Sequence, residues 1–125
     1  MISKEKVLKI IKDFDEIQHE MKQDANNLDN IQALQMSAKK KALNDYINSL
    51  SYDEYIDLCA LMDIGRNYVQ NGNKPMMCDY RVSRKSFEDN HKDEKNHASY
   101  LLGKSELNTY LRHSIHLYDE EELRF

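Results

Sequence analysis

Proline and glycine are scarce in this sequence, which has one proline, three glycines and no tryptophan among 125 residues. Both residues interrupt helices and shape the turns of sheet proteins, so their scarcity favours helices joined by short polar loops. A chain of this length also fits one domain with its own core. We therefore predict an all-α fold, with residues 1–125 forming a single-domain bundle of four to five helices around a central buried helix.

Cysteines and long apolar runs are also lacking. Cys59 and Cys78 form neither a CxxC motif nor a disulfide framework, which indicates a reducing compartment. The N-terminus, MISKEKVLKIIKDFDE, is amphipathic and lacks the apolar core of a secretory signal, and no later run is long enough to span a bilayer. Together with a mean hydropathy of -0.84, these absences predict a cytoplasmic protein with no membrane partner.

The net charge of -4 argues against a protein dominated by phosphate contacts, so nucleic acid is not the partner that we expect first.

The most informative stretch is residues 51–72, SYDEYIDLCALMDIGRNYVQNG. Ser51 followed three residues later by Glu54 is a capping box, which predicts the start of a helix. Gly72 supplies the left-handed residue that ends helices, and Pro75 prevents continuation. Apolar residues occupy two opposite sides of this helix, which is typical of a helix enclosed by its neighbours. They are Tyr52, Tyr55, Ile56, Cys59, Met62 and Val69 on one side and Leu61, Ile64 and Tyr68 on the other.

Helical spacing predicts the remaining elements. One helix starts at Ser3, a second runs from Asp29 or Asn30 to Leu50, a fourth covers 87–102, and a fifth is capped by Ser105. Residues 71–86 are expected to be a loop, and the acidic tail from Asp119 to fray. The predicted inward residues are Val7, Ile10, Ile11, Phe14, Ile17, Met21, Ile31, Leu34, Ala38, Leu43, Tyr46, Ile47, Leu50, Phe87, His91, Ala98, Leu101, Leu107, Tyr110, Leu111, Ile115 and Tyr118.

Two motifs in this chain, ALMDIGR at 60–66 and YLLGKSELNTYL at 100–111, resemble the paired signatures of a bacterial family known only as a domain of unknown function. The resemblance covers roughly Tyr52 to Leu111 and implies a small helical bundle with no established activity. This chain departs from the family pattern at Asp63, where an aromatic is common, and at Asn67 and Tyr68, where the family has Gly and an acid.

No set of residues with a workable catalytic arrangement is evident. Glu-x-x-His pairs occur at Glu16/His19 and Glu94/His97, but the first pair lies away from the apolar stripe of its helix, so a di-metal bundle is not expected. His113 and His116 lack a second pair at metal-ligand spacing, and Cys59 lacks a nearby base. We therefore predict no catalytic residues, no metal and no cofactor.

Arg66 is the exception to the apolar pattern of the central helix, because it projects from the broad apolar face one turn after Asp63. One interpretation is structural: the cation is favoured near the helix C-terminus and pairs with a carboxylate. The other is a guanidinium that recognises a partner or an anion, together with Asp63 and Tyr68. The sequence leaves both interpretations open.

The leading functional hypothesis is a small protein-binding or accessory protein without catalytic activity, whose partner is an unidentified protein or a second copy in a homodimer. The alternative is a nucleic-acid-binding protein. The segment 98–116 superficially follows a helix-turn-helix and would use Lys104, Asn108 and Arg112 for contacts. Gly103 is equally well explained as the C-cap of an ordinary helical hairpin.

Overall fold

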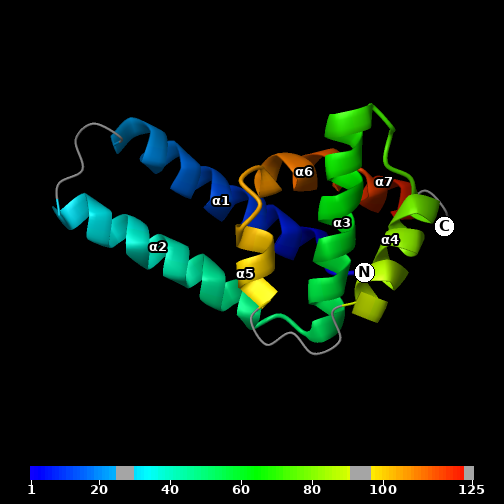
Figure 1. Ribbon diagram of the computed structural model, residues 1–125, viewed down its shortest axis with the longest axis horizontal. Helices are drawn as coiled ribbons and strands as arrows, with labels where there is room; N and C mark the ends of the chain where they lie inside the picture. Colours follow the sequence, from blue (N-terminus) through cyan, green and yellow to red (C-terminus); the bar gives the residue numbers. More distant parts are fainter. Residues whose placement is uncertain (25–29, 91–96, 123–125) are drawn as a thin grey trace.

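The computed structural model describes the backbone of residues 1–24, 30–90 and 97–122, and the side chains of residues 1–20, 38–89 and 98–119. These residues form helices and no strand, which confirms the all-α prediction. The helices are α1 (Lys4–Asp24), α2 (Asn30–Asn48), α3 (Tyr52–Asn71), α4 (Met77–Asn90), α5 (His97–Leu102), α6 (Leu107–Ser114) and α7 (Leu117–Glu122). Figure 1 shows α1 and α2 as a long antiparallel pair, with α3 and α4 at one end of that pair.

None of the helices in these ranges combines the length and apolarity needed to cross a lipid bilayer.

Helix α3 lies at the centre of the packing. It contacts chiefly α6 and α4, while α1 packs on α6 and α2, and α2 packs on α5. All eight residues from Tyr55 to Met62 are buried, as are Ile64 and Gly65. Because eight consecutive residues cover every side of an α-helix, this part of α3 is enclosed all round. The prediction of an enclosed middle helix is therefore confirmed for this part.

The last turns of α3 are different, because Tyr68 and Val69 are exposed and not buried as predicted. Residues 67–71 are all exposed, so the C-terminal end of α3 extends past the core, although the Tyr68 ring still lies against His113 of α6.

Both ends of α3 form as the sequence indicates. Ser51 Oγ accepts the amide of Glu54 at 3.1 Å, and Glu54 Oε1 accepts the amide of Ser51 at 3.1 Å. Gly72 has φ 72°, and its amide donates to the Tyr68 carbonyl at 2.8 Å. Glu54 also binds Lys6 Nζ on α1 at 2.5 Å, and this hydrogen bond lowers the pKa of Glu54.

Removing the capping hydroxyl has a predictable cost. We expect Ser51→Ala to lower the free energy of unfolding by about 1 kcal/mol, because the amide of Glu54 loses its acceptor at the helix start. Urea unfolding followed by circular dichroism measures this. Ser51→Asn is the control, since Asn is an equally good N-cap, and it should retain most of the stability. Equal losses in the two variants would contradict a capping role.

The prediction of a loop over residues 71–86 is wrong, since α4 begins at Met77. The buried side of α4 consists of Met77, Tyr80 and Ser83. Only two of these are apolar, so the helical period is weak in the sequence. The predicted helix over 87–102 is helical in its described parts, residues 87–90 of α4 and 97–102 of α5, but its start is wrong because α4 begins at Met77. Residues 91–96, including His91 and Glu94, lie outside the described part of the chain.

The last predicted helix is divided into α6 and α7. Ser105 does not cap α6: Glu106 holds that position without a side-chain hydrogen bond, and the Ser105 carbonyl instead accepts from Gln18 Nε2 of α1 at 2.6 Å. Helix α6 therefore begins without a side-chain cap. Residues 119–122 belong to α7, contrary to the predicted frayed tail, and residues 123–125 lie outside the described part.

The remaining core follows the predicted pattern closely, with one correction at Ala38, which is exposed and not buried. The side chains of Met21, Ile31 and Leu34 lie outside the described residues. Ser3 Oγ accepts the Lys6 amide at the start of α1, as expected of an N-cap. The predicted positions that are buried are Val7, Ile10, Ile11, Phe14, Ile17, Leu43, Ile47, Leu50, Ala98, Leu101, Leu107, Leu111 and Tyr118.

Candidate functional site

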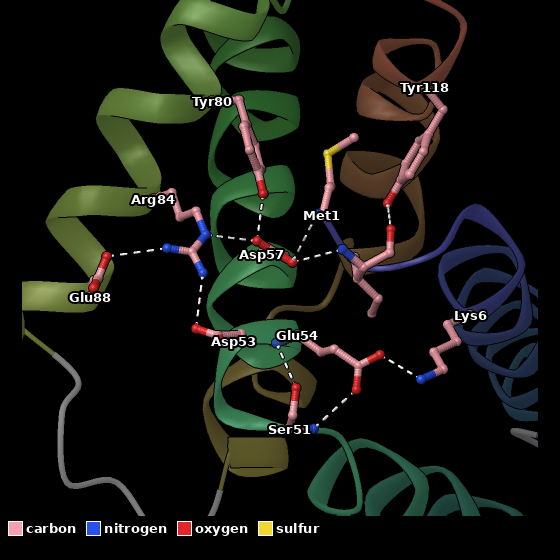
Figure 2. Close-up of polar contacts among 11 residues, drawn as sticks. Met1, Lys6, Ser51, Asp53, Glu54, Asp57, Tyr80, Arg84, Glu88 and Tyr118 are labelled. Atoms are coloured by element: carbon pink, nitrogen blue, oxygen red, sulfur yellow. Dashed lines mark hydrogen bonds and ion pairs between the residues drawn. The ribbon is translucent and has the colours of Figure 1, made fainter. Parts of the chain in front are cut away.

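The carboxylate of Asp57 is the most deeply buried charged group in the described residues, with 5% of the residue exposed. It lies in the second turn of α3 and accepts three hydrogen bonds (Figure 2). Oδ2 accepts the Ile2 amide at 2.7 Å, and Oδ1 accepts the Tyr80 hydroxyl at 2.5 Å and Arg84 Nε at 2.8 Å. The α-ammonium of Met1 lies 4.0 Å from Oδ2. Burial of this carboxylate is thus compensated by donors from two separate segments, residues 1–2 and α4.

Arg84 connects this buried carboxylate to the surface. Its Nη2 donates to Asp53 at 3.2 Å and its Nη1 donates to Glu88 at 3.1 Å (Figure 2). The hydrogen bond to Asp57 raises the pKa of the Arg84 guanidinium. Burial, and then the hydrogen bond to Asp57, raises the pKa of the Tyr80 hydroxyl far above its ordinary value. The guanidinium therefore stays charged and the phenol stays protonated, so both remain donors to Asp57.

The same cluster also fixes the start of the chain. Ile2 is buried, and while its amide binds Asp57, its carbonyl accepts the Tyr118 hydroxyl of α7 at 2.5 Å. Through these contacts Asp57 joins residues 1–2 and α4 to α3, and Tyr118 adds α7. We assign this cluster a structural role, because the hydrogen bonds of Asp57 and Tyr118 join separate parts of the chain.

Arg66 and Asp63, predicted for partner or anion binding, form an ion pair at 2.6 Å. The second carboxylate oxygen of Asp63 accepts Ser83 Oγ from α4 at 2.8 Å. Arg66 keeps 29% of its side chain exposed. Tyr68 is exposed, and the centroid of its ring lies 4.7 Å from the centroid of the His113 ring on α6. The structure therefore brings Arg66 and Asp63 together, whereas Tyr68 contacts a different helix.

The three residues of the nucleic-acid alternative have different environments. Asn108 is buried, and its Nδ2 donates to Asp15 at 2.5 Å and to Gln18 at 3.0 Å on α1. Its carbonyl oxygen is buried and has no hydrogen-bond partner among the described residues. Arg112 is exposed but bonded to the other oxygen of Asp15. Lys104 Nζ lies 4.9 Å above the ring of Tyr100. Asn108 thus serves the α1–α6 contact and is not presented to solvent, where a nucleic acid would have to reach it.

An open cleft of about 430 Å³ lies beside this contact and is lined by Asp15, Glu16, Gln18, His19 and Arg112. Glu16 is exposed, in agreement with the prediction that the Glu16/His19 pair faces away from the core. Among the described side chains, no three His, Cys, Asp or Glu residues are placed to hold a metal ion.

The other titratable candidates have contacts within the fold. His116 Nε2 lies 3.2 Å from the carbonyl of Pro75, and Cys59 is buried in the core. Cys78 is an exposed free thiol.

A model of one protein family matches residues 40–119, which is more than half of the chain, and its description is a protein of unknown function (DUF3775). The chain belongs to the DUF3775 family. This confirms the resemblance to a domain of unknown function that the two motifs indicated. Comparison with curated proteins and with solved structures found no match.

The DUF3775 match includes the whole of α3, α4, α5 and α6, and therefore Asp57, Tyr80 and Arg84. The sequence does not predict this cluster, since Asp57 is one of three acids in the first two turns of α3, beside Asp53 and Glu54. A usable signal is the spacing of Tyr80 and Arg84, which lie four residues apart and so on one face of a helix. The predicted loop over residues 71–86 conceals that spacing.

Proposed function

We propose that this DUF3775 protein is a small bacterial, cytoplasmic binding or accessory protein without catalytic activity. Its partner surface comprises the C-terminal end of α3, the segment that follows, and α4. Four of the six exposed large hydrophobic side chains in the described residues support this proposal, because they lie within 15 residues of one another in the sequence. They are Tyr68, Val69, Met76 and Val82. Exposed apolar side chains flanked by polar ones are typical of protein interaction sites.

The polar surroundings of these side chains suit the same role. Arg66 is held by Asp63 and Tyr68 lies against His113, so both side chains have neighbours that restrict their motion. Arg and Tyr carry a large share of binding energy at protein interfaces, and restricting them beforehand reduces the entropy lost on binding. The exposed thiol of Cys78 accords with a reducing cytoplasm.

A protein partner is favoured over a nucleic acid by the arrangement on α6. Asn108 donates its amide hydrogens to two α1 side chains, and Arg112 is paired with Asp15. Two of the three residues of the nucleic-acid alternative thus already have intramolecular partners.

The test compares two surface variants in cells that express the protein naturally. Tyr68→Ser combined with Met76→Ser removes two exposed apolar groups from the proposed surface. Leu8→Ser is the matched control, because Leu8 is equally exposed but lies on α1. After cross-linking and affinity purification, we expect a protein retained by wild type and Leu8→Ser to fall at least tenfold with the double variant.

Light scattering of the purified proteins tests whether that partner is a second copy. Dimerisation of wild type and Leu8→Ser, but not of the double variant, would identify the homodimer. Retention of the same proteins by all three forms, combined with a monomeric mass for all three, would contradict the proposed surface.

A further inference from the structure

One side of α4 points away from the rest of the molecule. Cys78, Arg81, Val82 and Lys85 are all exposed and follow the spacing i, i+3, i+4, i+7, so they share one side of the helix. Lys74 and Met76 are exposed immediately before α4 begins. We call these six residues the α4 face. The opposite side of α4, with Met77 and Tyr80, is buried, and α4 lies at the outer edge of the bundle beside α3 (Figure 1).

The α4 face carries the opposite charge to the chain as a whole. Residues 66–85 contain five Lys or Arg and one Asp, whereas the complete chain has 18 Lys or Arg and 22 Asp or Glu. Arg84 is neutralised by three carboxylates. No ion pair to a described carboxylate is formed by Lys74, Arg81 or Lys85. Asp79 and Asp89, the other acids of α4, lie near its two ends.

Two of these cations are placed unfavourably for the isolated protein. Arg81 and Lys85 are four residues apart on a helix, where like charges repel, and Asp89, four residues after Lys85, offsets only the charge of Lys85. A carboxylate placed between them would turn this repulsion into attraction, and the approach of an acidic partner would be accelerated by the local field.

The apolar side chains of the same face indicate the class of partner. Val82 is 74% exposed and Met76 is 53% exposed. A polyanion such as DNA would gain binding free energy from the cations but little from Val82 and Met76, and three cations neutralise few phosphates. A folded or helical protein segment can cover the apolar groups while its carboxylates meet the cations.

We propose that the α4 face binds an acidic amphipathic segment of a partner protein, whose apolar side covers Val82 and whose carboxylates pair with Arg81 and Lys85, while Met76 and Lys74 extend the contact beyond the start of α4. This inference rests on the proposed protein-binding function and specifies the chemistry of the partner. A second copy of this chain in a two-fold contact would place the cations of the two α4 faces opposite each other, so the self-association of this face is disfavoured.

The probe is a synthetic 16-residue helical peptide with leucines along one side and flanking glutamates. Its counterpart replaces each glutamate by lysine. Binding to the full-length protein is measured by fluorescence anisotropy at low salt and at physiological salt. We expect wild type to bind the glutamate peptide at least tenfold more tightly than the lysine peptide, with a difference that shrinks as salt rises.

Two charge-reversal variants separate a local effect from a general one. Arg81→Glu combined with Lys85→Glu should weaken the glutamate peptide at least tenfold and reverse the preference between the peptides. Lys40→Glu combined with Lys41→Glu changes the net charge by the same amount on exposed positions of α2 and should leave binding within twofold of wild type. Both variants should keep the wild-type melting temperature, since all four side chains are exposed.

Three outcomes would overturn the inference: no preference between the peptides, equal weakening by both double variants, or tighter binding of a 20-base-pair DNA duplex or phosphatidylglycerol vesicles than of the glutamate peptide. If the cellular partner still depends on Tyr68 and Met76 in any of these cases, only the chemistry assigned to the partner is wrong. If that dependence is absent while the peptide preference holds, the proposed function is wrong and only the binding of acidic peptides by the α4 face stands.

Discussion

Gly65→Ala is expected to be the most destabilising single-methyl change in this protein. A Cβ atom at Gly65 would lie 1.9 Å from the carbonyl oxygen of Tyr110 and 2.6 Å from its carbonyl carbon. Both are backbone atoms of α6, so no side-chain rotation relieves the overlap. To bring the new Cβ atom to a normal van der Waals distance from Tyr110, helices α3 and α6 would have to separate by roughly 1 Å or more. This separation would weaken the core contacts on either side of the crossing.

We expect Gly65→Ala to lower the free energy of unfolding by about 3 kcal/mol or more, and the melting temperature by about 10 °C or more. Urea and thermal unfolding, followed by circular dichroism, measure these quantities. Gly103→Ala is the matched control: its Cβ would meet the Ser99 carbonyl oxygen at 3.2 Å, which a small shift accommodates. A Gly65→Ala protein as stable as Gly103→Ala would show that α3 and α6 do not cross this closely.

The second large effect is expected at Asp57. In Asp57→Asn an NH₂ group replaces one of the two acceptor oxygens. If it replaces Oδ2 it faces the Ile2 amide, and if it replaces Oδ1 it faces the Tyr80 hydroxyl and Arg84 Nε, so donors meet donors in either case. Arg84 also loses its closest carboxylate. Breaking a buried ion pair while leaving the other partner in place costs about 3 kcal/mol or more, so the melting temperature should fall by about 10 °C.

Asp53→Asn is the control for this prediction, because Asp53 also binds Arg84 but has a side chain that is 83% exposed. Surface changes of this kind cost about 0.5 kcal/mol or less. Thermal unfolding of both variants at pH 7 compares them directly. Similar melting temperatures for the two variants would mean that Asp57 is not the buried centre of the cluster.

Neither of the contacts behind these two predictions can be predicted from the residues next to Gly65 or Asp57. Gly65 stands beside Arg66 in the ALMDIGR stretch, yet nothing in its neighbours predicts that another helix contacts its backbone. Asp57 is one of three acids in the first two turns of α3 and has no local feature that separates it from Asp53. In both cases the deciding contact lies more than 20 residues away in the chain.

Residues 71–86 show where reading the sequence by apolar periodicity fails. The inward side of α4 includes Ser83 and is supplemented by Arg84, and these polar residues are satisfied by Asp63 and Asp57 of α3. A helix that is held by hydrogen bonds to its neighbour lacks the apolar stripe by which helices are recognised. The α4 face was missed for the same reason, since it requires the helix to be assigned first.

The features that the sequence determined by itself are local or depend only on composition. They are the all-helical class, the capping box and glycine stop of α3, its enclosed middle part and the apolar stripe of α1. Each follows from residues within a few positions of one another, because helical periodicity and capping act over one or two turns.

The tertiary structure alone decided which polar groups are buried, which helix ends extend past the core, and which charges are left without a partner. Asp57 is compensated by segments before and after it, Asn108 by α1, and Tyr68 stays exposed although its ring lies against His113 of α6. The physical reason is that the energy of a buried polar group depends on donors and acceptors brought from distant parts of the chain.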